Sequence, residues 1–191
     1  MTTIYFVRHA EPNYDNHDDL TRELTTRGLE DAKKVTEFLK DKGIQVAYSS
    51  PYKRAVDTIQ DFTEAAGLEI HLEPDFRERA VGAWVENFRE YAMRQWSDFG
   101  WKLEGGESLK EVQDRNIHAL QEALKEHDGK TLVIGTHGTA LSTIINYYRP
   151  EFGYEDFLRI KDVMPWIVRF TFNDEECKMI EEIPTWSENH D

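Results

Sequence analysis

The chain has 191 residues, of which 39% are apolar and 31% are charged, and its formal net charge is −14. This composition suits a soluble protein with one hydrophobic core, and the negative charge argues against binding to nucleic acid or to an anionic membrane surface. The single cysteine, Cys177, excludes an internal disulfide framework and a multi-thiolate metal site, and it favours a cytoplasmic location.

The first apolar run, Ile4 to Val7, is too short for a signal segment or a membrane span and ends at Arg8-His9. The sequence contains no repeat, low-complexity block or Pro/Gly/Ser linker. We therefore predict a single domain over residues 1–191, with a cap insertion at about residues 73–106.

Strand-like and helix-like segments alternate along the chain. The predicted strands are residues 3–8, 45–49, 69–72, 130–135, 166–172 and 178–183. The predicted helices are residues 26–42, 51–66 and 109–126 and a further helix after Gly138. This order favours an α/β fold: a three-layer αβα sandwich with a mainly parallel central sheet and a small helical cap. The last two strands should form a hairpin around Asn173-Asp174, and the tail after Pro184 should fray.

Several residues indicate where the helices begin and which face they bury. Thr25 or Thr26 can cap the first helix, Ser50 with Pro51 should begin the second, and Ser108 with Glu111 suits a capping box on the third. The apolar stripe predicted for the first helix consists of Leu29, Ala32, Val35 and Leu39.

The predicted cap is rich in aromatic residues, namely Trp84, Phe88, Tyr91, Trp96, Phe99 and Trp101. Such a run can form the core of the cap, or it can line a substrate pocket, or one of its faces can serve each purpose.

Two histidines follow predicted strands: His9 after TIYFVR and His137 after TLVIGT. Ligands of open α/β sheets bind beyond the carboxyl ends of the strands. Arg8 precedes the first histidine, and Arg54 lies near the start of a helix, where backbone amides favour anions. The sequence thus predicts a locally positive, phosphate-binding rim in a negatively charged protein.

These residue types suit phosphoryl transfer. Arginines match the equatorial oxygens of a phosphoryl group, and a neutral imidazole such as that of His9 is a competent nucleophile. The leaving oxygen needs a proton, for which we assign Glu78. We find no spacing typical of metal ligands, and we expect no metal and no cofactor.

The same residues fall within ordered motifs. These are RHAEP (8–12), LTTRG (24–28), SSPYKRAVDT (49–58), RERAVGAW (77–84), GGES (105–108) and THG (136–138). Together they resemble the histidine phosphatase superfamily, the phosphoglycerate mutase-like proteins of the RHG-motif branch. The resemblance covers about residues 4–148.

The resemblance implies a metal-free, two-step reaction. His9 is phosphorylated while Arg8, Arg54 and His137 hold the phosphate, and Glu78 protonates the leaving oxygen. Water then discharges the phosphohistidine. The THG motif also places Gly138 in the substrate-binding set.

The chain departs from the family pattern next to the nucleophile. Ala10 stands where glycine is usual, Pro12 where threonine is common, and Asp15 where many members have a phosphate-facing asparagine. We assign Asn16, one position further on, to the substrate-binding set in its place.

The leading functional hypothesis is hydrolysis of phosphomonoesters of small metabolites. One alternative is a cofactor-dependent phosphoglycerate mutase, which shares the catalytic set. Another is a catalytically silent, phosphate-binding regulatory protein, suggested by Ala10, Pro12 and Asp15. The expected partner is a small phosphate ester, with no nucleic acid and no membrane, and the substrate and the oligomeric state stay open.

Overall fold

The computed structural model describes residues 1–184, so the predicted frayed tail lies outside the described residues. Its central sheet has six strands in the order β3-β2-β4-β1-β5-β6. The strands are β1 (Thr2–Arg8), β2 (Val46–Ser49), β3 (Ile70–Leu72), β4 (Thr131–Thr136), β5 (Trp166–Asn173) and β6 (Glu176–Ile183). Strands β1 to β4 pair in parallel, whereas β5 runs antiparallel to both β1 and β6. The mainly parallel sheet and the final hairpin are thereby confirmed.

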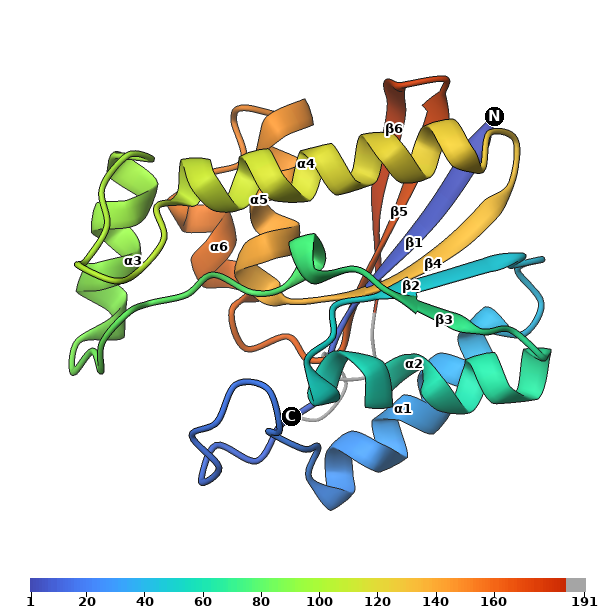
Figure 1. Ribbon diagram of the computed structural model, residues 1–191, viewed down its shortest axis with the longest axis horizontal. Helices are drawn as coiled ribbons and strands as arrows, with labels where there is room; N and C mark the ends of the chain where they lie inside the picture. The colour runs from blue at the N-terminus through green and yellow to red at the C-terminus, as the bar shows by residue number, and fades with distance from the viewer. Residues whose placement is uncertain (185–191) are drawn as a thin grey trace.

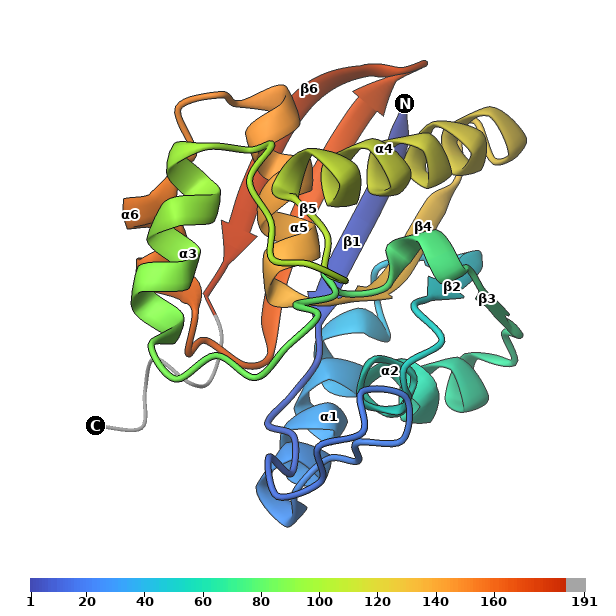
Figure 2. The same cartoon turned by 60° about the vertical axis from the view of Figure 1, so that its left-hand side comes forward.

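Helices cover both faces of the sheet, as Figures 1 and 2 show. The α-helices are α1 (Thr26–Leu39), α2 (Lys53–Ala66), α3 (Phe88–Ser97), α4 (Leu109–Glu126), α5 (Gly138–Tyr148) and α6 (Tyr154–Ile160), and a 3-10 helix, η1, spans Pro74–Phe76. Helices α1 and α2 lie on one face and α4 and α5 on the other. No helix within residues 1–184 is both long and apolar enough to cross a membrane.

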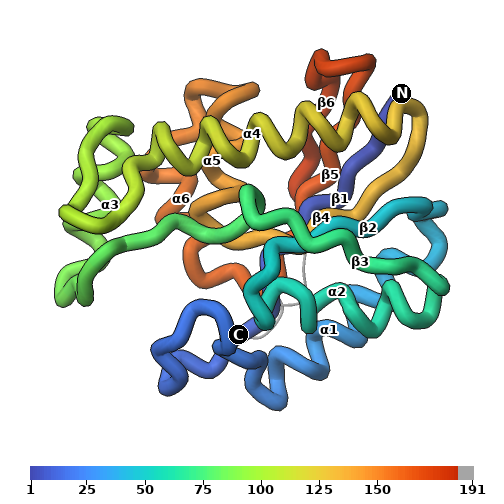
Figure 3. Tube along the Cα trace, viewed as in Figure 1, coloured from blue at the N-terminus to red at the C-terminus, as the bar shows by residue number. Residues whose placement is uncertain are grey.

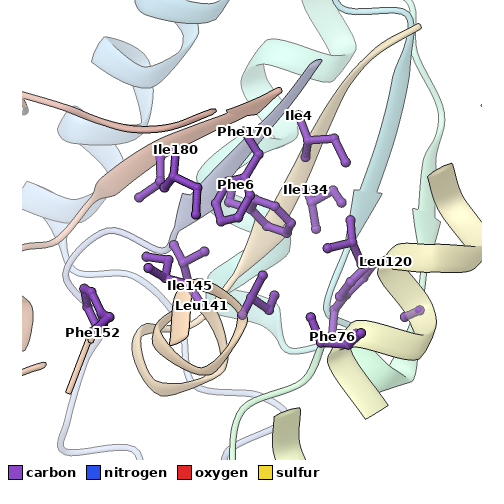
Figure 4. Close-up of a cluster of buried hydrophobic side chains, with 14 of the residues drawn as sticks. Ile4, Phe6, Phe76, Leu120, Ile134, Leu141, Ile145, Phe152, Phe170 and Ile180 are labelled. Carbon is purple, nitrogen blue, oxygen red and sulfur yellow. The ribbon is translucent and has the colours of Figure 1, made fainter. Parts of the chain in front are cut away.

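Strand β1 is buried on both faces, as a central parallel strand should be. Ile4 and Phe6 point into the core beneath α4 and α5, together with Leu120, Ile134 and Phe170 (Figure 4). Tyr5 and Val7 point the other way, toward α1 and α2. The strand that carries Arg8 is therefore fixed by packing from both layers.

The expected excursion after the third strand contains η1, a long irregular segment and α3, which lies at one end of the molecule (Figure 3). The aromatic residues of this excursion divide between the two predicted uses. Trp96 joins the main hydrophobic core, whereas Trp84 is 80% exposed and lines a cavity.

Four local expectations are corrected. Leu29 is 51% exposed, because the buried face of α1 passes through Gly28 and Asp31 instead. Helix α1 ends at Leu39 rather than at residue 42. Helix α2 begins at Lys53 with Tyr52 as N-cap. The Ser50 hydroxyl accepts from the backbone N–H of Tyr52 at 3.2 Å, just before the helix, and also bonds to His137.

The fourth correction concerns the start of α4. Ser108 accepts a hydrogen bond from the backbone N–H of Glu111, as a cap should. The Glu111 carboxylate does not return the bond that a capping box needs, because it pairs with Lys102 at 2.6 Å.

Candidate active site

Arg8 and His9 meet Thr136 and His137 at the carboxyl ends of the paired strands β1 and β4. Arg8 stands opposite Thr136 in the register, and the backbone N–H of His9 donates to the carbonyl of Thr136 at 3.2 Å. The rings of His9 and His137 lie edge to face, with centroids 5.3 Å apart. The predicted meeting of the two histidines is therefore present in the structure.

His9 is held as a neutral ring with one nitrogen left for chemistry. Its Nδ1 lies 2.8 Å from the carbonyl oxygen of Ala10, and because a carbonyl only accepts, Nδ1 carries the hydrogen. Burial lowers the pKa of His9 well below its ordinary value, and the charges of Arg8 and Arg54 lower it further. The lone pair is thus on Nε2, and His9 lines the cavity described below.

Arg8 is buried and spans from β1 to the end of α6. Its Nη1 donates to the carbonyls of Ile160 and Val163 at 2.8 and 3.2 Å, and its Nη2 donates to that of Lys161 at 2.8 Å. Within the described residues, its buried Nε has no partner. The carbonyls fix the guanidinium while one N–H is left to bind an anion.

Gly138 gives Arg8 the room for this position. A Cβ atom at Gly138 would lie 2.7 Å from the Arg8 Cζ, which is closer than real Cβ contacts come. The first residue of α5 must therefore be glycine if the guanidinium is to pack against the start of that helix.

Arg54 extends from the first turn of α2 into the cavity lined by His9. It donates through Nη1 to the backbone carbonyl of Asp19 at 2.7 Å, and its Nη2 lies 3.4 Å from the Asp19 carboxylate. Arg22 also lies 3.4 Å from that carboxylate. Asp19 thus bridges two arginines in this structure.

His137 is fully buried behind His9 and does not line the cavity. Its Nε2 hydrogen-bonds with the Ser50 hydroxyl at 2.8 Å, and Nδ1 has no partner in the described part of the chain. Burial lowers the pKa of His137 well below its ordinary value, with a further contribution from Arg54. Ser50 therefore orients this ring, whereas its position in the sequence predicted only a helix cap.

Glu78 lies across the cavity at the N-terminus of α5. Its Oε1 accepts from the backbone N–H groups of Arg79 and Ala140, both at 2.9 Å, and its Oε2 accepts from that of Thr139 at 3.0 Å. Because Oε2 accepts a single bond, it keeps a lone pair free for a proton.

Asn16 is not among the residues that line the cavity. Its amide donates to Glu23 at 3.0 Å, and Asn13 donates to the same carboxylate at 2.6 Å. These two bonds lower the pKa of Glu23 to about 2. Asn16 therefore braces the loop between β1 and α1 in this structure, and its assignment to phosphate binding stays a prediction.

The cavity over His9 has a volume of about 490 Å³ and is lined by more cations than anions. Its charged lining residues are Arg8, Asp19, Arg22, Arg54, Glu78 and Arg79. At its rim, His17 stacks on Trp84 with the ring centroids 5.3 Å apart.

Sequence reasoning missed Arg22, Arg79 and the stack of His17 on Trp84. Arg79 is the neighbour of Glu78 in the RERAVGAW segment, and that adjacency was the available signal. The stack had no local signal, because it joins loops that are distant in sequence.

Fold and site together define an α/β protein with an arginine-rich cleft over a buried, neutral histidine. The chain belongs to the histidine phosphatase superfamily (branch 1), whose sequence profile it matches over residues 4–181. The family and the fold predicted from the motifs are thereby confirmed.

Named relatives include both phosphatases and mutase-like proteins. The chain is 32% identical to phosphoglycerate mutase-like protein 4 of Arabidopsis thaliana, over 78% of this chain and 71% of that protein. It is 33% identical to phosphoserine phosphatase 1 of Hydrogenobacter thermophilus, over 72% and 71%. The solved phosphoserine phosphatase of Entamoeba histolytica, in complex with 3-phosphoglyceric acid, is similar with a TM-score of 0.80 and 24% identity, covering 97% of this chain and 98% of that one. This last similarity shows the fold alone.

Proposed function

We propose that the protein is a metal-independent phosphatase that hydrolyses small phosphomonoesters through a phosphohistidine at His9. Family membership and the phosphatase among the relatives support the reaction class. The observation that carries the proposal is the state of His9: its Nδ1–H is tied to a carbonyl, and its ring faces a cavity lined by Arg8, Arg54 and Glu78.

In the first step, His9 Nε2 attacks phosphorus and the bond from phosphorus to the ester oxygen breaks. Arg8 and Arg54 neutralise the charge on the equatorial oxygens, and the N-terminus of α5 adds its partial positive charge. Glu78 gives its proton to the leaving oxygen, so that an alcohol departs.

In the second step, water attacks phosphorus and the P–N bond breaks. Glu78 now accepts a proton from the water, and inorganic phosphate and neutral His9 are formed. The backbone carbonyl of Ala10 accepts the Nδ1–H of His9, which leaves the lone pair on Nε2 for the attack.

The nucleophile is tested with p-nitrophenyl phosphate in the presence of EDTA. We expect the wild type to turn over and His9→Ala to be inactive while it remains folded. With a phosphorus-32-labelled ester, label should be trapped on the wild type quenched in alkaline detergent, in which a phosphohistidine is stable, and not on the variant. Turnover retained by His9→Ala would rule out His9 as the nucleophile.

The proton donor is tested by changing the leaving group. Protonation matters most for a poor leaving group, so Glu78→Gln should lower kcat/KM for an alkyl phosphate by about 10²-fold or more. The loss on p-nitrophenyl phosphate should be much smaller, because p-nitrophenolate leaves without a proton. Equal losses on both esters would remove Glu78 from this role.

A phosphoglycerate mutase is the second candidate, favoured by the name of the Arabidopsis relative. A mutase incubated with 3-phosphoglycerate and a bisphosphoglycerate primer would form 2-phosphoglycerate, whereas a phosphatase releases inorganic phosphate. Binding of phosphate without turnover or a phosphoenzyme would instead indicate a silent binding protein.

A further inference from the structure

The loop between β1 and α1 places a carboxylate beside two arginines of the cleft. Asp19, Arg22 and Arg54 all line the main cavity. The Asp19 Oδ1 lies 3.4 Å from Nη1 of Arg22 and 3.4 Å from Nη2 of Arg54. No step of the proposed reaction uses this carboxylate. A negative charge at this place opposes the binding of a phosphate group, so its presence needs a reason.

The two contacts of the Asp19 carboxylate are weak. Charge-assisted bonds between a guanidinium N–H and a carboxylate are normally about 2.7 to 2.9 Å long, shorter than either contact. The Asp19 side chain is 58% exposed, whereas that of Arg54 is 4% exposed. An exposed ion pair contributes little to stability. A phosphate group offers the same arginines more oxygen atoms and more charge, so it can take the place of the carboxylate.

The backbone that carries Asp19 is fixed independently of its side chain. The Asp18 carboxylate accepts from the backbone N–H of Leu20 at 2.9 Å, and the Asp18 carbonyl accepts from that of Arg22 at 2.9 Å. The Leu20 carbonyl accepts from the backbone N–H of Lys53 at 3.0 Å, which ties the turn to the start of α2. Rotation of the Asp19 side chain, without movement of the loop, is therefore enough to clear the arginines.

Both arginines keep their positions when the carboxylate leaves. Nη1 of Arg54 donates to the backbone carbonyl of Asp19 at 2.7 Å, and its Cζ lies 5.2 Å from the ring centroid of Tyr52. Nε of Arg22 donates to the carbonyl of Asn16 at 2.7 Å. None of these contacts involves the Asp19 side chain. The two guanidinium groups are thus preorganised for an anion, and the carboxylate occupies them only until one binds.

We propose that Asp19 is the internal counter-ion of the phosphate site. Its carboxylate neutralises Arg22 and Arg54 in the empty cleft, and the phosphate group of the substrate or product displaces it. The exchange lowers the affinity for each phosphate that enters, so inorganic phosphate leaves the cleft more readily after hydrolysis. This inference rests on the proposed function, because it takes the cleft over His9 to be the phosphate site.

The test compares the binding of inorganic phosphate, measured by calorimetry, to His9→Ala and to His9→Ala/Asp19→Asn. Asparagine keeps the size of the side chain and the backbone bond to Arg54, but it removes the charge. The dissociation constant should fall by about fivefold or more in the double variant. His9→Ala/Asp18→Asn is the matched control. It removes a charge from the same turn, keeps an oxygen that can accept from Leu20, and lies outside the cavity; its dissociation constant should change by less than about twofold.

Kinetics with His9 present give a second readout. Asp19→Asn should lower both the KM for p-nitrophenyl phosphate and the inhibition constant of inorganic phosphate, by similar factors, without raising kcat. This is the pattern expected when a competitor for the phosphate site is lost, because substrate, transition state and product all gain equally. A residue that merely held Arg54 in place would, when changed, raise KM or lower kcat/KM.

Two results would overturn the inference. Unchanged or weaker phosphate binding in the Asp19→Asn double variant would show that the carboxylate does not compete with phosphate. An equal gain in the Asp18→Asn control would show that any loss of negative charge from the turn has the same effect. If Asp19→Asn melts below the assay temperature, Asp19→Ser decides by the same comparison. Failure of the proposed function is a separate result: the wild type would turn over no phosphomonoester, while calorimetry would still report whether Asp19 competes with phosphate.

Discussion

His9 shows how burial at the end of a strand prepares a nucleophile. A histidine in water is half protonated at about pH 6.5, and a protonated imidazole has no lone pair to attack phosphorus. Burial and the two neighbouring arginines lower the pKa of His9, so the neutral ring persists on the acidic side of that value. The cost of burying polar atoms is offset at Nδ1 by its bond to the Ala10 carbonyl.

We predict that His9 is already neutral at pH 6.5, where an ordinary histidine is half protonated, and that it carries its hydrogen on Nδ1. A lowered pKa moves protonation of His9 to lower pH. The activity that depends on neutral His9 should therefore be lost only below the ordinary pKa of histidine. Nitrogen-15 NMR of labelled histidine, assigned with His9→Ala, measures both properties. A midpoint near 6.5, or the hydrogen on Nε2, would contradict the prediction.

The variant Arg54→Met tests one cause of the lowered His9 pKa. The charge of Arg54 is one of the causes that lower the pKa of His9, so its removal should move the His9 midpoint upward. The exposed His118 should be unchanged in the same spectra. An unchanged His9 midpoint would leave burial and Arg8 as the causes.

At the scale of elements, α4 holds the segment that carries Glu78. Arg115 of α4 donates to the backbone carbonyls of Asp75, Arg77 and Glu78 at 2.7 to 3.0 Å. It also forms a two-bond pair with the Glu107 carboxylate, at 2.9 Å for each bond. One side chain thus ties η1, the Glu78 segment and the start of α4 together.

We predict that Arg115→Met lowers kcat for an alkyl phosphate by about tenfold or more, with a smaller change in KM, because misplacement of Glu78 affects the transition state most. Loss of the bonds should also destabilise the fold by about 2 kcal/mol. Steady-state kinetics and urea unfolding measure the two effects. Lys110→Gln is the control on the same helix, since its exposed pair with Asp114 contributes little. A loss of stability with an unchanged kcat would make Arg115 purely structural.

The elements that the sequence predicted are those whose signals are local. Periodicity and motif position located β1, β4 and α5, and therefore Arg8, His9 and His137. Helix α6 was missed because its seven residues are too few to show a periodic pattern.

Contacts between segments that are far apart in the chain could not be predicted from a single sequence. Ser50 stands in a good position to cap α2, and its hydroxyl accepts from the backbone N–H of Tyr52, yet it also bonds to His137, 87 residues away. The Arg8 contacts with residues 160–163 are equally remote. Both arise from the pairing of β1 with β4 and the packing of α6, which tertiary structure alone decides.

At the scale of the whole molecule, a net charge of −14 coexists with a cleft lined by four arginines, Arg8, Arg22, Arg54 and Arg79. The attraction by the arginines of the cleft and the repulsion by the acidic remainder of the surface act over different distances. Arginine contacts act within a few ångströms and in a partly desolvated cavity, where salt screens them little. Repulsion by the distributed acidic surface acts over the size of the protein and is therefore sensitive to salt.

We predict that kcat/KM for a dianionic phosphate ester rises by about twofold or more between about 10 and 100 mM potassium chloride, as the Debye length falls from about 30 to about 10 Å. The long-range repulsion is then screened before the cleft contacts weaken. Removing charge far from the site should act like salt: Glu175 and Glu176 lie at the β5–β6 end of the sheet, opposite the end that carries Arg8. The double variant Glu175→Gln/Glu176→Gln should have a higher kcat/KM at low salt and a smaller rise with salt. If kcat/KM falls steadily from the lowest salt in both proteins, the arginine cleft dominates the field at every distance, and the acidic surface has no part in substrate capture.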